Sequence, residues 1–276
     1  MNATSVPRGN AGRPYIDIRN LSQVFGDRSR GAVTALRDIN LGIRQGEFVC
    51  LLGPSGCGKS TLLNAIAGFT SPTAGSISVD GRPVSAPGPD RGMVFQEYAL
   101  FPWMTVEKNI TFGLQIQKMP REKIRATVDG LLDKLQLTDF RDRYPKDLSG
   151  GMRQRVAIAR VLALDSPILL MDEPFGALDA LTRRTLQDEL LRIWEELRKT
   201  IVFVTHSIEE SVYLADRVVA MTYRPGTIKR EVQVTLARER DPSSTEFNRY
   251  TRELAQLVME EQYRHNQDEI RVLAAE

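Results

Sequence analysis

The chain has 276 residues, 42% of them hydrophobic and 26% charged, as expected for a globular protein with a substantial core. Its 37 basic and 35 acidic residues are mixed along the chain and give a net charge of +2, which offers no basic footprint for nucleic acid. No run of about 18 apolar residues predicts a membrane span, and Cys50 and Cys57 lie too close together for a useful disulfide, which indicates reduced, cytosolic thiols.

The N-terminal part of the chain predicts strands. Residues 1–14 are polar, resemble neither a signal peptide nor an anchor, and are predicted to be disordered. The stretches "YIDIRNL" and "AVTALRDINLGI" alternate apolar and polar residues, which predicts an antiparallel layer with one exposed face. The continuous apolar run "FVCLL" predicts a parallel strand buried on both faces, and "LLNAIAGF" predicts a helix soon after it.

The rest of the chain reads as a helical insertion followed by alternating strands and helices. Residues from about 98 to 153 lack β-branched runs and predict a helical subdomain. The later strands "PILLMDE", "TIVFVTH" and "RVVAMT" alternate with helices, which predicts a parallel sheet covered by helices. We expect one α/β domain over 15–240 and a helical tail over 241–276. The tail carries an apolar stripe, which favours packing on the core over binding a partner; the stripe consists of Phe247, Tyr250, Leu254, Leu257 and Val258.

A glycine-rich loop, "GPSGCGKST", stands between the predicted strand "FVCLL" and the helix that follows. It matches the pattern G-x-x-x-x-G-K-[ST], in which glycines let main-chain N–H groups approach phosphates. Lys59 is then placed to neutralise the β and γ oxygens of a nucleotide, and Ser60 to offer its hydroxyl to Mg²⁺. The predicted nucleotide-binding residues are Gly53, Pro54, Ser55, Gly56, Cys57, Gly58, Lys59, Ser60 and Thr61.

Polar residues follow three of the other predicted strands. Asp172 and Glu173 end "ILLMDE", where Asp172 is placed to hold Mg²⁺ through water and Glu173 to polarise the attacking water. Gln96 follows "GMVF" and His206 follows "TIVFVT". Because parallel strands end at one edge of the sheet, all four should converge beside the loop. We assign Glu173, His206 and Gln96 to catalysis and Ser60, Gln96 and Asp172 to Mg²⁺; the other histidine, His265, is expected on the solvated surface.

A second glycine turn, "LSGGM", precedes a predicted helix. Ser149 is typical of an N-cap, and Gly150 and Gly151 would expose N–H groups of the first turn to a phosphate. A purely structural capping box would need Glu or Gln where Met152 stands. The chain thus carries two candidate phosphate cradles.

Taken together, these motifs resemble, in order and spacing, an ATP-binding cassette (ABC) ATPase over about Tyr15–Val234. The stretches "GMVFQEYALFPWMTV" and "MTYRPGTIKREVQV" further resemble ATPases of the nitrate/sulfonate/taurine importer type. The resemblance implies an α/β P-loop NTPase (RecA-like) fold with a parallel sheet, an antiparallel β subdomain and a helical subdomain.

The resemblance also implies partners and further site residues. A homodimer would sandwich two Mg·ATP head to tail, with Ser149–Gly151 closing over the nucleotide of the other copy. Phe25 would stack on adenine, although a core position is an alternative, and Asp179 would couple the two sites. Two permease subunits would bind near residues 97–103, a solute-binding protein would act indirectly, and the dimer would lie peripherally on the cytoplasmic face of the cell membrane. Met152 departs from the glutamine that is usual in the family.

The sequence therefore predicts the ATP-hydrolysing subunit of an importer, a translocase for a small solute that the sequence does not specify. One alternative is a soluble ABC ATPase of DNA repair or translation, although such proteins usually carry two cassettes in one chain or large insertions, and also basic surfaces, and the sequence shows neither. Another is a kinase or GTPase, but no N-K-x-D motif is present and a kinase has no use for "LSGGM".

Overall fold

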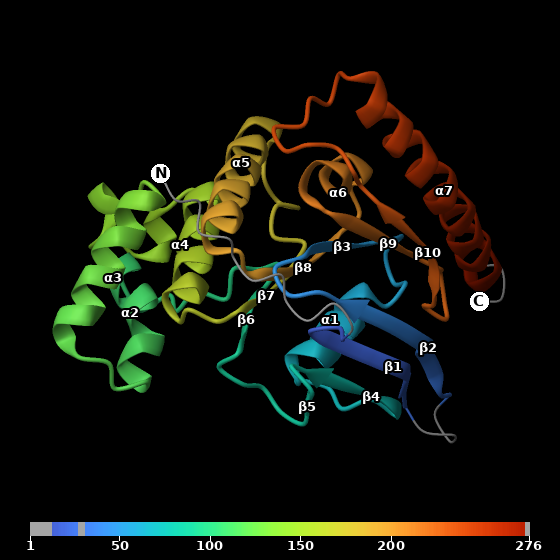
Figure 1. The fold of residues 1–276 in the computed structure, drawn as a ribbon, viewed down its shortest axis with the longest axis horizontal. Helices are drawn as coiled ribbons and strands as arrows, with labels where there is room; N and C mark the ends of the chain where they lie inside the picture. Colours follow the sequence, from blue (N-terminus) through green and yellow to red (C-terminus); the bar gives the residue numbers. More distant parts are fainter. Residues whose placement is uncertain (1–12, 27–30, 274–276) are drawn as a thin grey trace.

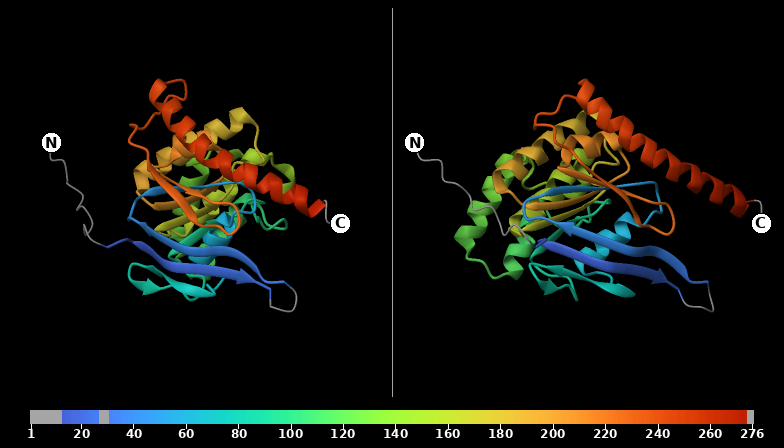
Figure 2. Two further views of the ribbon diagram at one scale, coloured as in Figure 1. Left: turned by 90° about the vertical axis from the view of Figure 1, so that its right-hand side faces the viewer. Right: turned by 45° about the vertical axis from the view of Figure 1, so that its right-hand side comes forward.

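The computed structural model describes residues 13–26 and 31–273. The predicted disordered segment, 1–14, lies almost wholly outside the described residues. Two sheets make up the fold, and helices pack on both faces of the larger one (Figures 1 and 2). None of the helices in the described part of the chain is both long and apolar enough to cross a membrane.

The first sheet is antiparallel, as the alternating stretches predict, with the order β2-β1-β4-β5. Alternate residues of β1 are buried, so one face packs on the core. The strands are β1 (Ile16–Phe25), β2 (Val33–Ile43), β4 (Ala74–Val79) and β5 (Arg82–Pro83).

The second sheet has the order β10-β9-β3-β8-β7-β6, and its pairs from β9 to β6 are parallel. The structure adds one antiparallel edge strand, β10, that the parallel-sheet prediction lacks. The strands are β3 (Phe48–Leu52), β6 (Arg91–Val94), β7 (Ile168–Asp172), β8 (Thr200–Thr205), β9 (Arg217–Met221) and β10 (Ile228–Gln233).

Both faces of the second sheet are covered. Phe48, Cys50 and Leu52 of β3 face one apolar cluster, formed with α2 to α7, while Val49 and Leu51 face another, formed with α1 and the antiparallel sheet. This explains why β3 is a continuous apolar run. The helices are α1 (Lys59–Ala67), α2 (Val106–Ile116), α3 (Arg121–Lys134), α4 (Gly150–Ala163), α5 (Ala180–Leu197), α6 (Ile208–Leu214) and α7 (Thr245–Leu273), with 3-10 turns η1 (Thr138–Phe140) and η2 (Pro145–Asp147).

The long C-terminal helix α7 lies across the molecule beside α6 and β9 (Figure 1). Its predicted stripe packs inward, since Phe247, Tyr250 and Leu254 are buried and Leu257 and Val258 are partly buried. The prediction for His265 is wrong. Its ring lies 4.7 Å from the ring of Tyr223 and is half-buried, because α7 runs back over the end of β9.

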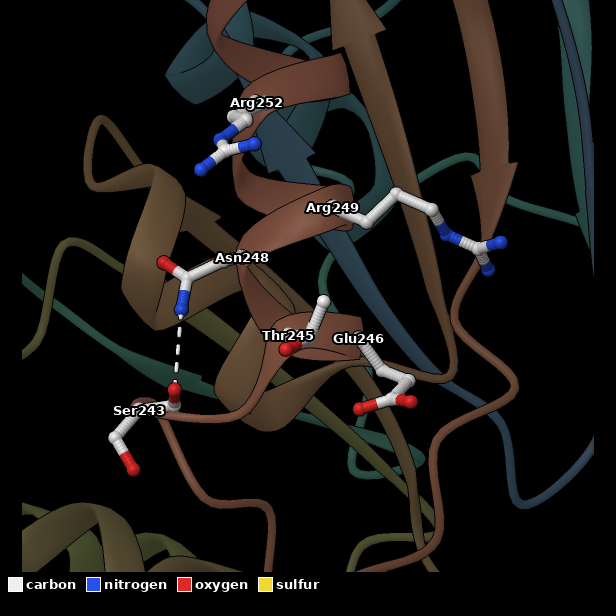
Figure 3. A pocket seen from close by; sticks show the side chains of 6 residues that line it. All are labelled: Ser243, Thr245, Glu246, Asn248, Arg249 and Arg252. Carbon is white, nitrogen blue, oxygen red and sulfur yellow. Dashed lines mark hydrogen bonds between the residues drawn. The ribbon is translucent and has the colours of Figure 1, made fainter.

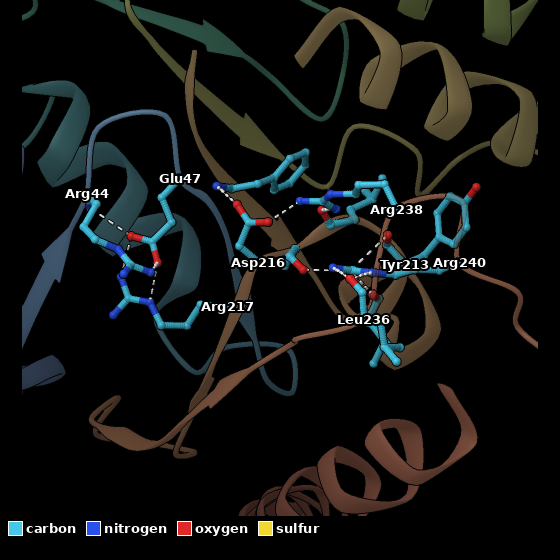
Figure 4. A network of polar contacts seen from close by, with 12 residues as sticks. Arg44, Glu47, Tyr213, Asp216, Arg217, Leu236, Arg238 and Arg240 are labelled. Carbon is cyan, nitrogen blue, oxygen red and sulfur yellow. Dashed lines mark hydrogen bonds and ion pairs between the residues drawn. The ribbon is translucent and has the colours of Figure 1, made fainter. Parts of the chain in front are cut away.

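Buried arginines secure the segments around β9 (Figure 4). Arg217 donates to both carboxylate oxygens of Glu47, at 2.9 and 3.0 Å. Arg240 donates to the main-chain oxygen of Ala215 at 2.7 Å, and burial lowers the pKa of Arg240 to about 10. Because these guanidinium groups satisfy main-chain oxygens and a buried carboxylate, Arg217 fixes β9 to the start of β3, and Arg240 fixes the chain that leads into α7.

Candidate nucleotide-binding and hydrolysis site

The glycine-rich loop connects β3 to α1. Gly56 and Gly58 have φ angles of 73° and 95°, in the left-handed region that favours glycine. A Cβ at Gly58 would lie 2.6 Å from Cδ2 of Leu36, so the loop packs directly on β2. Gly58 is the N-cap of α1 and provides no side-chain cap, so the N–H groups of the first turn remain available for an anion.

Lys59 places its charge over this loop. Its side chain is buried, and Nζ donates to the main-chain oxygens of Gly53 at 2.8 Å and Pro54 at 2.9 Å. Burial raises the pKa of the neighbouring Cys57 thiol, which keeps it protonated at neutral pH. The loop therefore combines one ammonium group with the positive end of α1, an arrangement suited to phosphate.

One carboxylate reaches the start of α1. Ser60 Oγ donates to Asp172 Oδ1 at 3.0 Å, across the junction of α1 and the end of β7. Burial raises the pKa of Asp172, and the hydrogen bond from Ser60 opposes that effect. A hydroxyl and a carboxylate are oxygen ligands of the kind Mg²⁺ prefers, so this pair fits the cation that the motif implies.

Glu173 and His206 lie together, as the strand order predicts. His206 Nδ1 is 2.9 Å from Glu173 Oε2, across the ends of β7 and β8. Glu173 has a φ of 43°, uncommon for a residue with a side chain, and its N–H donates to Val204 O at 3.0 Å. The neighbouring strand thus holds a strained residue in place, as is common at functional sites.

A cavity of about 20 Å³ lies beside this pair, large enough for about one water molecule. Glu210 of α6 lines it together with Glu173, Arg183 and His206. Burial raises the pKa of Glu210, and its Oε1 accepts from Gln187 at 2.9 Å. Sequence reasoning missed Glu210, because an acidic residue in the first turn of a helix usually interacts with solvent and the helix N-terminus. Its place shortly after His206 in the sequence indicates that it lies near the site but not that it is buried there.

Gln96 and Phe25 are exposed near the site. Gln96 is exposed in the turn after β6, which pairs with β7, and the adjacent Phe95 stacks on Phe69 with ring centroids 6.0 Å apart. The Phe25 side chain ends β1 and is 45% exposed. The core alternative for Phe25 is therefore wrong, and its ring is free to stack on a flat ligand.

The second glycine turn packs against α5. Ser149 is the N-cap of α4, where its Oγ accepts from Met152 N at 3.3 Å, as predicted. A Cβ on Gly151 would lie 2.6 Å from Cγ2 of Thr182, so that glycine permits a close approach. Asp179 is the N-cap of α5 and accepts from Thr182 N at 3.0 Å, and this hydrogen bond lowers the pKa of Asp179. Thr182 thus links the second turn to the segment that contains Asp179.

A wider hollow lies at the start of α7 (Figure 3). Polar and charged side chains line it, among them Arg249, Arg252 and Asn248, whose Nδ2 donates to Ser243 O at 3.4 Å. None of the predicted site residues lines it, so the candidate site is the edge of the second sheet.

The fold and the site define a P-loop ATPase with a helical subdomain, the class of the ATP-binding cassettes. A family model described as "ABC transporter" matches residues 36–176, and the chain belongs to this family. It hydrolyses ATP, as the family resemblance implies.

Curated relatives and solved structures agree with this assignment. The chain is 47% identical to the nitrate import ATP-binding protein NrtD of Synechocystis sp., over 88% of this chain and 95% of that protein. It is 50% identical to the taurine import ATP-binding protein TauB of Jannaschia sp., over 80% and 83%. A dimeric ATP-binding cassette in a post-hydrolysis state with ADP and Pi superposes with a TM-score of 0.71, at 33% identity, over 80% of this chain and all of that one.

Proposed function

We propose that the chain is the ATP-hydrolysing subunit of an importer, in which two copies bind and hydrolyse Mg·ATP and drive two permease subunits. The observation that carries the proposal is the meeting of two polar pairs, Ser60 with Asp172 and Glu173 with His206, at the sheet edge beside the phosphate loop. Each pair brings together side chains from two different parts of the fold, so their nearness is a property of the tertiary structure.

In this proposal the residues divide the work of hydrolysis. The loop from Gly53 to Thr61 binds the phosphates, with Lys59 neutralising the β and γ oxygens. Ser60, Asp172 and Gln96 hold Mg²⁺, which supplies charge neutralisation at the transferred phosphoryl group. Glu173 polarises the attacking water, and His206 contacts the γ-phosphate and orients Glu173 through the contact at 2.9 Å.

The second glycine turn acts on the partner's nucleotide. Ser149 Oγ accepts from Met152 N, which leaves the hydroxyl proton free to donate to a phosphate oxygen of the other copy. Asp179 couples the two sites, because its helix touches Gly151 through Thr182. Met152 packs against the core, and its main-chain N–H serves the cap whatever its side chain.

An exposed aromatic surface suits the permease. Trp103 is 70% exposed, and its ring lies 5.8 Å from that of Phe101, which in turn lies 4.6 Å from the ring of Phe112. Such rings are enriched at protein interfaces. With permeases bound here, the dimer lies peripherally on the cytoplasmic face of the cell membrane, and a solute-binding protein delivers the solute from the other side.

The relatives named for nitrate and taurine import favour a small anionic or zwitterionic solute of that kind. The alternative, a soluble ABC ATPase of DNA repair or translation, has no specific contact in its favour and becomes an outcome of the test.

The experiment is to purify the tagged chain from its own cells and to grow a deletion strain on nitrate, taurine or other sulfonates as sole nitrogen or sulfur source. We expect two membrane subunits to co-purify and growth on one class of solute to be lost. Wild-type chain should restore growth, and the Glu173→Gln chain should not. Co-purification with ribosomes or DNA, with growth unaffected on every source, would overturn the proposal.

A further inference from the structure

The turn between β9 and β10, residues 222–227, lies directly against the phosphate loop. A Cβ on Gly226 would stand 2.1 Å from the main-chain oxygen of Cys57. Arg224 Nε donates to Gly56 O at 3.4 Å, and a Cβ on Gly53 would lie 3.2 Å from Met221 O. The turn and the strand end before it therefore contact the loop at three residues.

The same turn also forms hydrogen bonds with β2 and within itself. Gly226 N donates to Ala35 O at 2.9 Å, and Arg37 N donates to Gly226 O at 3.0 Å. Inside the turn, Thr227 N donates to Thr222 Oγ1 at 2.8 Å, and Thr222 Oγ1 donates to Pro225 O at 2.9 Å. These internal hydrogen bonds make the turn rigid, so a displacement at Tyr223 is transmitted to Gly226.

The C-terminal helix α7 contacts the turn at Tyr223. Glu261 of α7 has a fully buried side chain, and its Oε2 accepts from Tyr223 N at 2.9 Å. Its Oε1 accepts from Lys229 Nζ at 2.7 Å. The ring of His265, one helical turn further on, lies beside the Tyr223 ring. Burying a carboxylate is costly, and the apolar stripe already docks α7, so this carboxylate fixes a particular position of the helix on the turn.

We propose that the 222–227 turn positions the phosphate loop, and that Glu261 is the positioning residue through which docking of α7 sets the affinity for ATP. This inference rests on the proposed role of the loop as the phosphate site. It gives the C-terminal helix a function beyond packing, since whatever shifts α7 on the turn changes nucleotide binding. By reciprocity, ATP binding must tighten the contact between Glu261 and the turn.

The first test changes the helix. In Glu261→Ala, Tyr223 N–H loses its acceptor, and the dissociation constant for ATP should rise by about five- to tenfold, the equivalent of about one net hydrogen bond. Glu261→Gln retains an acceptor oxygen and should bind ATP within about twofold of wild type. Glu260→Ala is the matched control, because the neighbouring Glu260 is exposed and forms its ion pair with Lys229 without contacting the turn at Tyr223 N. Calorimetry gives the affinity, and steady-state kinetics should show KM raised with kcat retained.

The second test changes the turn. Gly226→Ala places a methyl group against the Cys57 oxygen and should also raise the dissociation constant. Gly130→Ala should not, because a Cβ there would meet no described atom within 4 Å beyond its chain neighbours and the backbone of its own helix. In the unmodified protein, ATP should slow hydrogen exchange at the Tyr223 amide.

The inference would be overturned if both Glu261→Ala and Gly226→Ala lowered the melting temperature but left the affinity for ATP unchanged. The contact between α7 and the turn would then serve stability alone. Unchanged exchange at Tyr223 would overturn it even if neither variant folded. Lys59→Ala tests the underlying role of the loop separately, since retained ATP binding in that variant contradicts the phosphate site itself.

Discussion

At the scale of single residues, the proposed function assigns the activation of water to Glu173. Glu173→Gln keeps the shape of the side chain but removes the carboxylate that polarises water. We expect ATP binding to be retained and phosphate release to fall by about 10²-fold or more. The exposed neighbour Glu209 of α6 provides a control, because Glu209→Gln should hydrolyse ATP as wild type does. Wild-type turnover in Glu173→Gln would remove Glu173 from the mechanism.

Glu210 predicts a pH dependence of stability. Burial raises its pKa in the folded state above the ordinary value of 4.5, so the folded protein binds this proton more tightly than the unfolded chain. The stability it contributes is present below pH 4.5 and is lost as pH rises through the folded pKa. Glu210→Gln removes that loss and keeps an acceptor for Gln187. The free energy of unfolding of the variant, relative to wild type, should therefore increase with pH above this value in denaturant titrations. A difference that stays constant with pH contradicts the assignment.

The site residues were predictable where a motif fixes both residue type and place on a strand end. Asp172, Glu173 and His206 are of this kind, because Asp172 ends the apolar strand β7 and the other two each directly follow an apolar strand. Glu210, Glu261 and His265 were not predictable. Their environments depend on partners distant in sequence, Gln187 for the first and Tyr223 for the other two, and neither periodicity nor spacing encodes such contacts.

At the scale of elements, α7 is part of the folded core. Leu254 is fully buried, so Leu254→Ala should lower the free energy of unfolding by about 2–5 kcal/mol through lost burial and a cavity. Met259 on the same helix is 70% exposed, and Met259→Ala should change it by less than about 0.5 kcal/mol. Denaturant titration measures both. Equal, small effects would mean that α7 does not dock as the structure has it.

Strands and helices with a strong apolar period were predicted well, and β10 was not. Only Val232 of β10 is buried. As an edge strand, β10 forms main-chain hydrogen bonds with a neighbour on one side, β9, and its polar residues face solvent. In the helical insertion, Ile124, Val128, Leu131, Leu132 and Leu135 recur at helical spacing and predict α3, whereas α2 is predicted only as part of the mainly helical region. The domain boundaries at residues 14, 240 and 98–153 remain predictions.

At the scale of the whole molecule, the chain carries two glycine turns that we propose to bind phosphate. The first, at Gly53–Thr61, lies beside the carboxylates of the sheet edge. The second, at Ser149–Gly151, packs on Tyr98 and on the helix that Asp179 begins. In the proposed head-to-tail homodimer each turn would contact a nucleotide, because the second would face the site of the other copy.

The most direct test is a mixed dimer that carries Ser149→Arg on one chain and Lys59→Ala on the other. Arginine at 149 fills the space for the γ-phosphate, and Lys59→Ala disables the loop of its own chain. In the head-to-tail arrangement both changes fall on one composite site and the other site keeps all its parts. With the two chains tagged differently, ATP binding and phosphate release should then reveal one competent site, with residual hydrolysis. Finding no competent site, while each mixed dimer of a single variant with wild type retains one, would contradict the account.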